Sequence, residues 1–136
     1  ISGSTDAVSA AIRLEGGDSQ INIECNNIIN NLGAGVTMSA RFTGPDSAVT
    51  VNQNNIMGNA AGGLVVIPGG YTGTLDATNN FWGSSFGPSG AGPGFGDAVT
   101  PNDAKVTFDP WLAAPSDCPP PLPIPPRWQP SSPVAG

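Results

Sequence analysis

The 136 residues of this chain suit a single domain, and only 10% of them are charged, whereas soluble domains average about 25%. A net charge of −6 with only four basic residues argues against nucleic acid or an anionic membrane surface as a partner, because phosphate groups need clustered Lys and Arg. The absence of histidine removes His-dependent catalytic triads and imidazole metal ligands, and no apolar run reaches the ~20 residues of a membrane span. We expect no cofactor.

An apolar alternation followed by two asparagines, or close variants of it, occurs three times along the chain. The three stretches are INIECNNI at 21–28, VTVNQNNI at 49–56 and LDATNNF at 75–81. A period of two is typical of a strand, and an Asn-Asn pair favours a turn. Counted from the first asparagine of each pair, the intervals are 28 residues (Asn26 to Asn54) and 25 residues (Asn54 to Asn79), which indicates a solenoid. Between its apolar pair and its two asparagines, the third repeat is one residue shorter than the first two.

A second apolar series, at 11–14, 35–38 and 63–66, interlaces with the first, and the apolar pairs at 28–29, 56–57 and 81–82 supply a third face. The chain is therefore predicted to pass the same faces on each circuit, as an all-β solenoid of about three coils around an apolar interior. Asparagines at equivalent corners can hydrogen-bond to one another in ladders. The predicted structural corners are Asn26, Asn27, Asn54, Asn55, Asn79 and Asn80.

The first predicted domain, 1–112, ends in a closing segment at 83–112. Its Gly-, Pro- and Ser-rich part, 83–103, is expected to be an ordered loop only if Trp82, Phe86 and Phe95 hold it, and a short strand follows at 106–108. We expect the C-terminal end of the apolar column to be plugged, or alternatively a sugar to be stacked, by four aromatic residues: Phe81, Trp82, Phe108 and Trp111.

Residues 113–136 form a proline-rich tail with the composition of an extended polyproline II segment. Leu122, Ile124 and Trp128 between the prolines indicate that the tail docks on another surface. A disulfide between Cys25, beside the first corner, and Cys118, in the tail, would tie the tail to the solenoid. The alternative is a buried free thiol at Cys25.

The repeat Ile-x-Ile-x-x-Asn-Asn-Ile, followed by Asn-Asn and Gly-Val, resembles the right-handed parallel β-helix repeat of pectate-lyase-like proteins and of many bacterial surface proteins. The stretch NNFWG at 79–83 and the later Val106-x-Phe-x-Pro-Trp-Leu112 are similar to a closing segment often found after the last full turn of such secreted proteins. Together these matches cover roughly residues 10–112. The resemblance implies a right-handed β-helix in an extracellular or cell-surface setting and identifies no substrate.

Candidate catalytic and metal-binding residues are sparse. Glu24, Asn52 and Asp76 could align at equivalent positions of three coils, but two carboxylates without a placed base argue against catalysis. Oxygen ligands for calcium could come from Asp97, Asn102, Asp103 and Asp109, although their spacing matches no calcium loop and favours turn capping.

The ends of so short a solenoid are large relative to its height, because coils stack at only about 4.8 Å. Residues 1–10 contain no convincing cover for the N-terminal end, and an uncovered strand edge recruits another chain. We therefore expect a secreted, non-enzymatic structural or adhesive element that associates with copies of itself, with a head-to-tail filament as one arrangement. The alternatives are an extracellular β-helix that binds, cleaves or hydrolyses polysaccharide, and the closing module of a larger surface adhesin.

Overall fold

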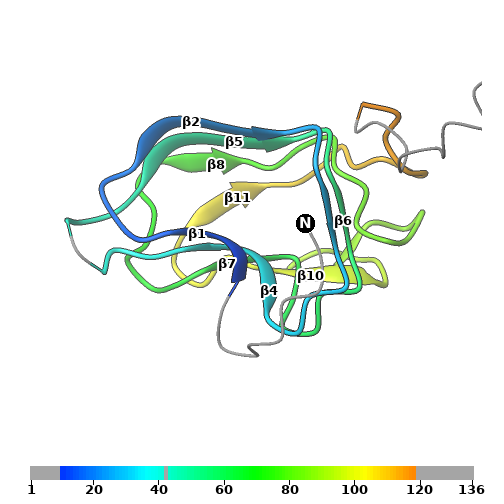
Figure 1. Ribbon diagram of the computed structural model, residues 1–136, viewed down its shortest axis with the longest axis horizontal. Coiled ribbons are helices and arrows are strands. Elements are labelled where there is room, and N and C mark those ends of the chain that lie inside the picture. The colour runs from blue at the N-terminus through cyan, green and yellow to red at the C-terminus, as the bar shows by residue number, and fades with distance from the viewer. Residues whose placement is uncertain (1–9, 42, 119–136) are drawn as a thin grey trace, which may run out of the picture.

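The structure is a computed structural model that describes residues 10–41 and 43–118. Within these residues the protein is all-β, with eleven strands and no helix, so no helix there could cross a membrane. Figure 1 shows the chain winding about an interior so that successive strands of one face lie side by side. This confirms the predicted β-solenoid of about three turns.

Each turn contributes strands to three faces. The first turn contains β1 (Ala10–Leu14), β2 (Ser19–Glu24) and β3 (Asn27–Ile29). The second contains β4 (Ala34–Met38), β5 (Ser47–Asn52) and β6 (Asn55–Met57). The third contains β7 (Leu64–Val66) and β8 (Thr74–Asp76), and it meets the third face through a single bridge between Phe81 and Asn55.

The faces are parallel sheets with matched register. One sheet has the order β1-β4-β7-β10-β9, the second β11-β8-β5-β2 and the third β3-β6. All described strand pairs are parallel, and the register of the first sheet joins Ile12 to Val36 and Val36 to Leu64. Parallel strands need a long connection, which each circuit of the solenoid provides.

The closing segment is more regular than its composition indicates. It contains β9 (Pro88–Gly90), β10 (Gly96–Thr100) and β11 (Lys105–Thr107), of which β10 pairs with β7 and β11 with β8. The interpretation of 83–103 as a loop was therefore wrong over β9 and β10. Residues 96–100 are poor in strand-forming residues, yet they pair with the edge of β7 that would otherwise be unpaired. This pairing places Val99 beside Leu64, where Val99 is fully buried.

The core is a set of apolar columns that run through the turns. Val36, Leu64 and Val99 occupy equivalent positions of β4, β7 and β10, and none of them is exposed. Ile28 and Ile56 form a similar column on the third face. Alternation along each strand directs these side chains inward, and their removal from water stabilises the stack.

Phe86 and Phe95 do not hold the closing segment to the core as expected. Their side chains are 63% and 81% exposed, and their rings pack edge to face with centroids 5.8 Å apart. Trp111 holds this segment instead, since its ring lies against Gly87, where an added Cβ would come within 2.6 Å of the ring. Gly87 also has a φ of 89°, a conformation that favours glycine.

Candidate functional site

The most organised polar feature is the corner between the second and third faces. In each turn the first corner residue has a left-handed backbone, with φ of 61° at Cys25, 59° at Gln53 and 59° at Asn79. This conformation is uncommon for residues other than glycine and is best tolerated by asparagine and aspartate. The next residue of each turn is an asparagine whose side chain points into the stack: Asn26, Asn54 or Asn80.

These three asparagines form a continuous hydrogen-bonded ladder. The side-chain amide of Asn26 donates to Asn54 Oδ1 over 3.1 Å, and that of Asn54 donates to Asn80 Oδ1 over 3.1 Å. The same oxygens accept the backbone N–H groups of Asn26 and Asn54, at 2.9 and 3.0 Å. Because Asn54 and Asn80 are fully buried, these amides are occupied in holding the turns together.

The ladder corrects the predicted alignment of the third repeat. Asn80, rather than Asn79, continues the column of Asn54, and Asn79 takes the corner position of Gln53. The intervals are then 28 and 26 residues. Thr50 pairs with Asp76, so the third repeat is not shortened before its corner. Phe81 replaces the second asparagine of the pair and bridges to Asn55.

A second ladder, which was not predicted from the sequence, lies at the end of the third face. Asn31 Nδ2 donates to Asn59 Oδ1 over 2.8 Å, and Asn59 Nδ2 donates to Asp97 Oδ2 over 2.8 Å. Asn31 and Asn59 are buried and lie 28 residues apart. Asn26 and Asn54 of the first ladder are also 28 residues apart. This shared interval is the sequence signal that could have identified Asn31 and Asn59 as ladder residues. Nothing local in the sequence marks Asp97 as the third member.

Two aspartates of the closing segment, Asp97 and Asp103, cap backbone groups. Asp97 accepts the N–H groups of Gly58 and Asn59, each at 2.9 Å, and Asp103 accepts the N–H of Gly69 at 3.1 Å. Asn102 donates its amide to the carbonyl of Val66. Residues 10–41 and 43–118 contain no group of three His, Cys, Asp or Glu side chains that could hold a metal ion. Turn capping is therefore the chemistry that this arrangement performs.

The expected alignment of Glu24, Asn52 and Asp76 was wrong. Glu24 pairs with Asn52, but Asp76 pairs with Thr50, two residues along the strand. Asp76 Oδ1 accepts the N–H and hydroxyl of Thr78, at 3.0 and 2.7 Å, and the amide of Asn52 at 3.2 Å. Burial raises the pKa of Asp76, but these hydrogen bonds outweigh it and leave the pKa below its usual value. This carboxylate is thus a turn cap kept ionised.

One carboxylate is placed unfavourably. Asp46 is fully buried, and its Oδ1 accepts the N–H of Asp18 at 3.0 Å while its Oδ2 has no partner among the described residues. Burial raises the pKa of Asp46, and the nearby charge of Asp18 adds to this, while backbone hydrogen bonds oppose it. The pKa of Asp46 is therefore raised above its usual value.

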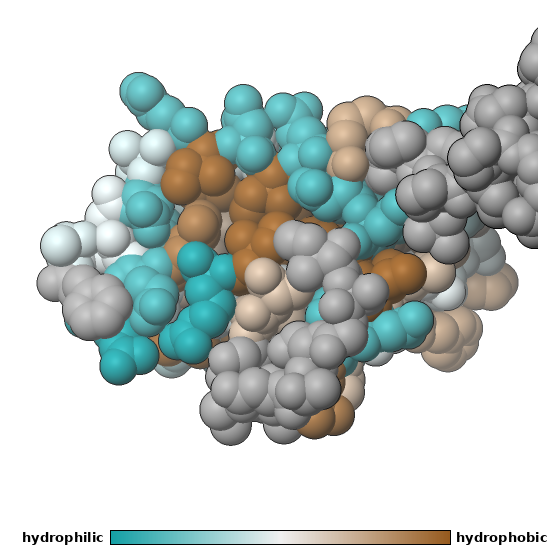
Figure 2. All heavy atoms as spheres, viewed as in Figure 1, coloured by the Kyte–Doolittle hydropathy of each residue, from teal (hydrophilic) through white to brown (hydrophobic). Residues whose placement is uncertain are grey.

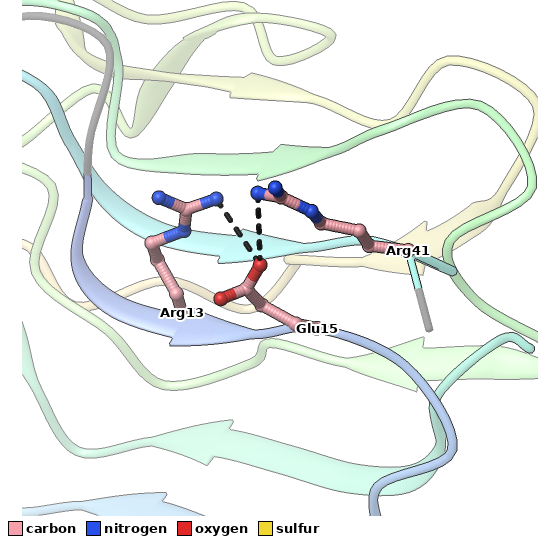
Figure 3. A network of polar contacts seen from close by, with 3 residues as sticks. All are labelled: Arg13, Glu15 and Arg41. Carbon is pink, nitrogen blue, oxygen red and sulfur yellow. Dashed lines mark hydrogen bonds and ion pairs between the residues drawn. The ribbon is translucent and has the colours of Figure 1, made fainter. Parts of the chain in front are cut away.

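Two of the four basic residues meet at one carboxylate beside β1. Figure 3 shows Arg13 and Arg41 directed at Glu15 Oε1, over 3.3 and 3.4 Å. Their side chains are 37% and 61% exposed, and exposed ion pairs contribute little to stability. This cluster therefore adds little to the fold.

The aromatic residues of the predicted plug lie over the last turns. Phe81 and Trp82 are buried, which leaves their rings unavailable to a sugar. Phe108 and Trp111 stack with centroids 6.4 Å apart and pack against the core cluster. The indole N–H of Trp111 donates to the carbonyl of Ser85 at 3.3 Å.

The start of the proline-rich tail lies along the corner, so residue 113 is not where contact with the body ends. Cys118 forms a disulfide with Cys25, with Cα atoms 5.1 Å apart. Ser116 donates its N–H to Asn55 Oδ1 at 2.7 Å. The predicted anchor residues, Leu122, Ile124 and Trp128, lie outside the described residues.

None of the family models, curated proteins or solved structures with which the chain was compared matches it.

Replacing Asn54 with alanine should lower the free energy of unfolding by about 2–4 kcal/mol, because the partly buried amide of Asn26, the buried oxygen of Asn80 and the carbonyl of Ile23 lose their partner. Urea denaturation followed by circular dichroism measures this. Asn22→Ala, which removes an exposed amide from β2, should change it by no more than about 0.5 kcal/mol. Equal effects of the two substitutions would show that the ladder does not hold the turns.

Replacing Asp46 with asparagine should stabilise the protein at pH 7 by about 1–2 kcal/mol, because it removes a buried charge with an unpaired oxygen. The folded pKa lies above the ordinary 3.8, so the stability that Asp46 contributes is present below that value and is lost as the pH rises. The advantage of Asp46→Asn should therefore shrink as the pH falls towards 4, as thermal denaturation at several pH values would show.

The matched control is Glu24→Gln, which neutralises an exposed carboxylate and should leave stability within about 0.5 kcal/mol at each pH. An Asp46→Asn protein less stable than the parent at pH 7 would mean that the fold requires the carboxylate.

Proposed function

We propose that this chain is a non-enzymatic, extracellular or cell-surface structural or adhesive element that associates with copies of itself through the N-terminal end of its solenoid. The observation that carries the proposal is the exposure of the first apolar layer. Ile12, Leu14 and Ile21 are only partly buried. Their register partners one turn on are almost fully buried: Val36, Met38 and Val49.

The surface of this end supports the same proposal. Figure 2 views the molecule with the first turn towards the reader and shows apolar surface gathered between β1 and β2, framed by polar residues. Among the described strands, β1 pairs only with β4 and β2 only with β5. Each therefore has an outer edge of backbone groups that another strand can pair with.

The C-terminal end offers less to a partner. Its edge strands, β9 and β11, have three residues each, whereas β1 has five and β2 six. Val99 of its last layer is fully buried, and Pro88 opens β9. Contact between two N-terminal ends would close into a dimer, whereas contact between unlike ends would give an open filament. The filament thus needs the short C-terminal edges to pair with the long ones of the first turn.

An extracellular setting is supported by the disulfide and by the resemblance of the repeat to right-handed β-helices of secreted, pectate-lyase-like and surface proteins. Catalysis on polysaccharide is not favoured, because Asp76 is occupied in capping and is out of register with Glu24. Polysaccharide binding has one feature in its favour, the exposed ring pair of Phe86 and Phe95, and a glycan array would test it.

Self-association should appear as a rise in mass with concentration in analytical ultracentrifugation of the purified chain. Ile12→Lys places a charge in the exposed apolar layer and should weaken association about tenfold or more. Ile67→Lys, at a position 41% exposed elsewhere on the surface, should associate like the parent. A parent chain that stays monomeric at every concentration would refute the proposal, as would equal weakening by both substitutions.

A further inference from the structure

The segment after β11 crosses all three turns along one corner. It begins at the third turn, where the carbonyl of Pro110 accepts the N–H of Asn79 at 2.7 Å and the N–H of Leu112 donates to the carbonyl of Asn80 at 2.9 Å. It reaches the second turn at Ser116 and the first at Cys118. Figure 1 shows this segment, in orange, on the outer side of the corner. We call residues 113–118 the strap.

The strap is hydrogen-bonded by side chains at corner positions that recur in successive turns. Ser116 donates its N–H to Asn55 Oδ1 at 2.7 Å, and its carbonyl accepts the amide of Asn55 at 3.4 Å. The hydroxyl of Ser116 donates to Gln53 Oε1 at 3.2 Å. Gln53 occupies the left-handed corner position that Cys25 occupies one turn earlier. The corner thus presents the side-chain amides of Gln53 and Asn55 and the sulfur of Cys25 to this one segment.

We propose that the outer surface of this corner is a docking site, here called the groove, for a short segment of chain. The strap occupies it, the Cys25–Cys118 bond acts as the lock that holds the strap there, and the strap of a second copy is the partner that fits once this bond is reduced. The inference is independent of association through the N-terminal end, because it concerns a lateral surface and a different bond.

A dithiol reductant can open the lock by reducing the Cys25–Cys118 disulfide. Its two thiols are oxidised to a cyclic disulfide while the Cys25–Cys118 bond breaks, and two protons and two electrons pass to the protein sulfurs as two thiols. Cys118 is exposed and Cys25 is half-buried, so the bond lies within reach of a reductant. The ladder of Asn26, Asn54 and Asn80 does not involve this disulfide.

The noncovalent contacts of the strap are few compared with those of the body. Within the strap, Ser116 supplies the contacts with Gln53 and Asn55, and two of the three are longer than 3.1 Å. Ala113, Ala114 and Pro115, which connect it to Leu112, are exposed. A released strap can therefore swing out without disturbing a strand. A second copy carries the same strap, with the same groups for the same groove.

Hydrogen exchange on the oxidised and reduced protein tests the lock. Reduction should remove protection from the N–H of Ser116 while the N–H groups of β2, β5 and β8 keep theirs. Unchanged protection of Ser116 would mean that the strap needs no lock. Loss of protection throughout the strands would mean that the disulfide stabilises the whole fold rather than the position of the strap alone. Either result would overturn the proposal.

Mixing two single-cysteine variants tests the partner. Cys25→Ser retains Cys118 and Cys118→Ser retains Cys25, so neither can close the bond within one chain. On mild oxidation of the mixture, the heterodimer should form about tenfold faster than either homodimer, because groove binding raises the local concentration of the two thiols. Alkylation followed by a non-reducing gel gives the rates.

The groove itself is probed by a second substitution in the Cys118→Ser partner. Asn55→Ala removes the amide that contacts Ser116, together with its hydrogen bond to Asn27, and should abolish the preference for the heterodimer. Asn22→Ala removes an exposed amide of β2 that accepts the hydroxyl of Thr50 away from the strap, and it should leave the preference intact. A heterodimer that forms no faster than the homodimers, or a preference that survives Asn55→Ala, would overturn the assignment of the groove.

Discussion

The stack of turns depends on two columns of side-chain amides. The apolar interior alone tolerates a slip of two residues between parallel strands, because the same face stays inward. A buried asparagine that bonds to the equivalent residue of the next turn does not tolerate it, since both its amide and its oxygen would lose their partners. The columns of Asn26, Asn54 and Asn80 and of Asn31, Asn59 and Asp97 therefore set the register that the strands follow.

The acidic residues serve this architecture. Asp76, Asp97 and Asp103 each accept hydrogen bonds from backbone N–H groups in turns, which a carboxylate does more strongly than a neutral oxygen. Asp46 is the exception, because burial disfavours its charge and one of its oxygens is unpaired.

The two ends of the solenoid differ, and only one corner carries the strap. The closing segment adds β10 and β11 over the third turn and buries Val99, whereas the first turn leaves Ile12, Leu14 and Ile21 partly exposed. The strap then returns the chain from the third turn to the first and ties it there through Cys25. The first apolar layer is thus partly exposed at one pole, and a disulfide holds the strap at one corner.

The sequence by itself determined the parallel solenoid, its number of turns and its asparagine corners, because alternation, Asn-Asn pairs and a repeated interval are local or periodic signals. Tertiary structure decided that Asn80 rather than Asn79 joins the ladder, that Asp97 ends the second one, and that β10 extends the first sheet. The physical reason is distance along the chain. A ladder partner lies 26 to 38 residues away, and Ser116 lies 61 residues from Asn55. Which of two adjacent asparagines is buried depends on its hydrogen bonds to the neighbouring turn of the solenoid, and the local sequence contains no information about that neighbour.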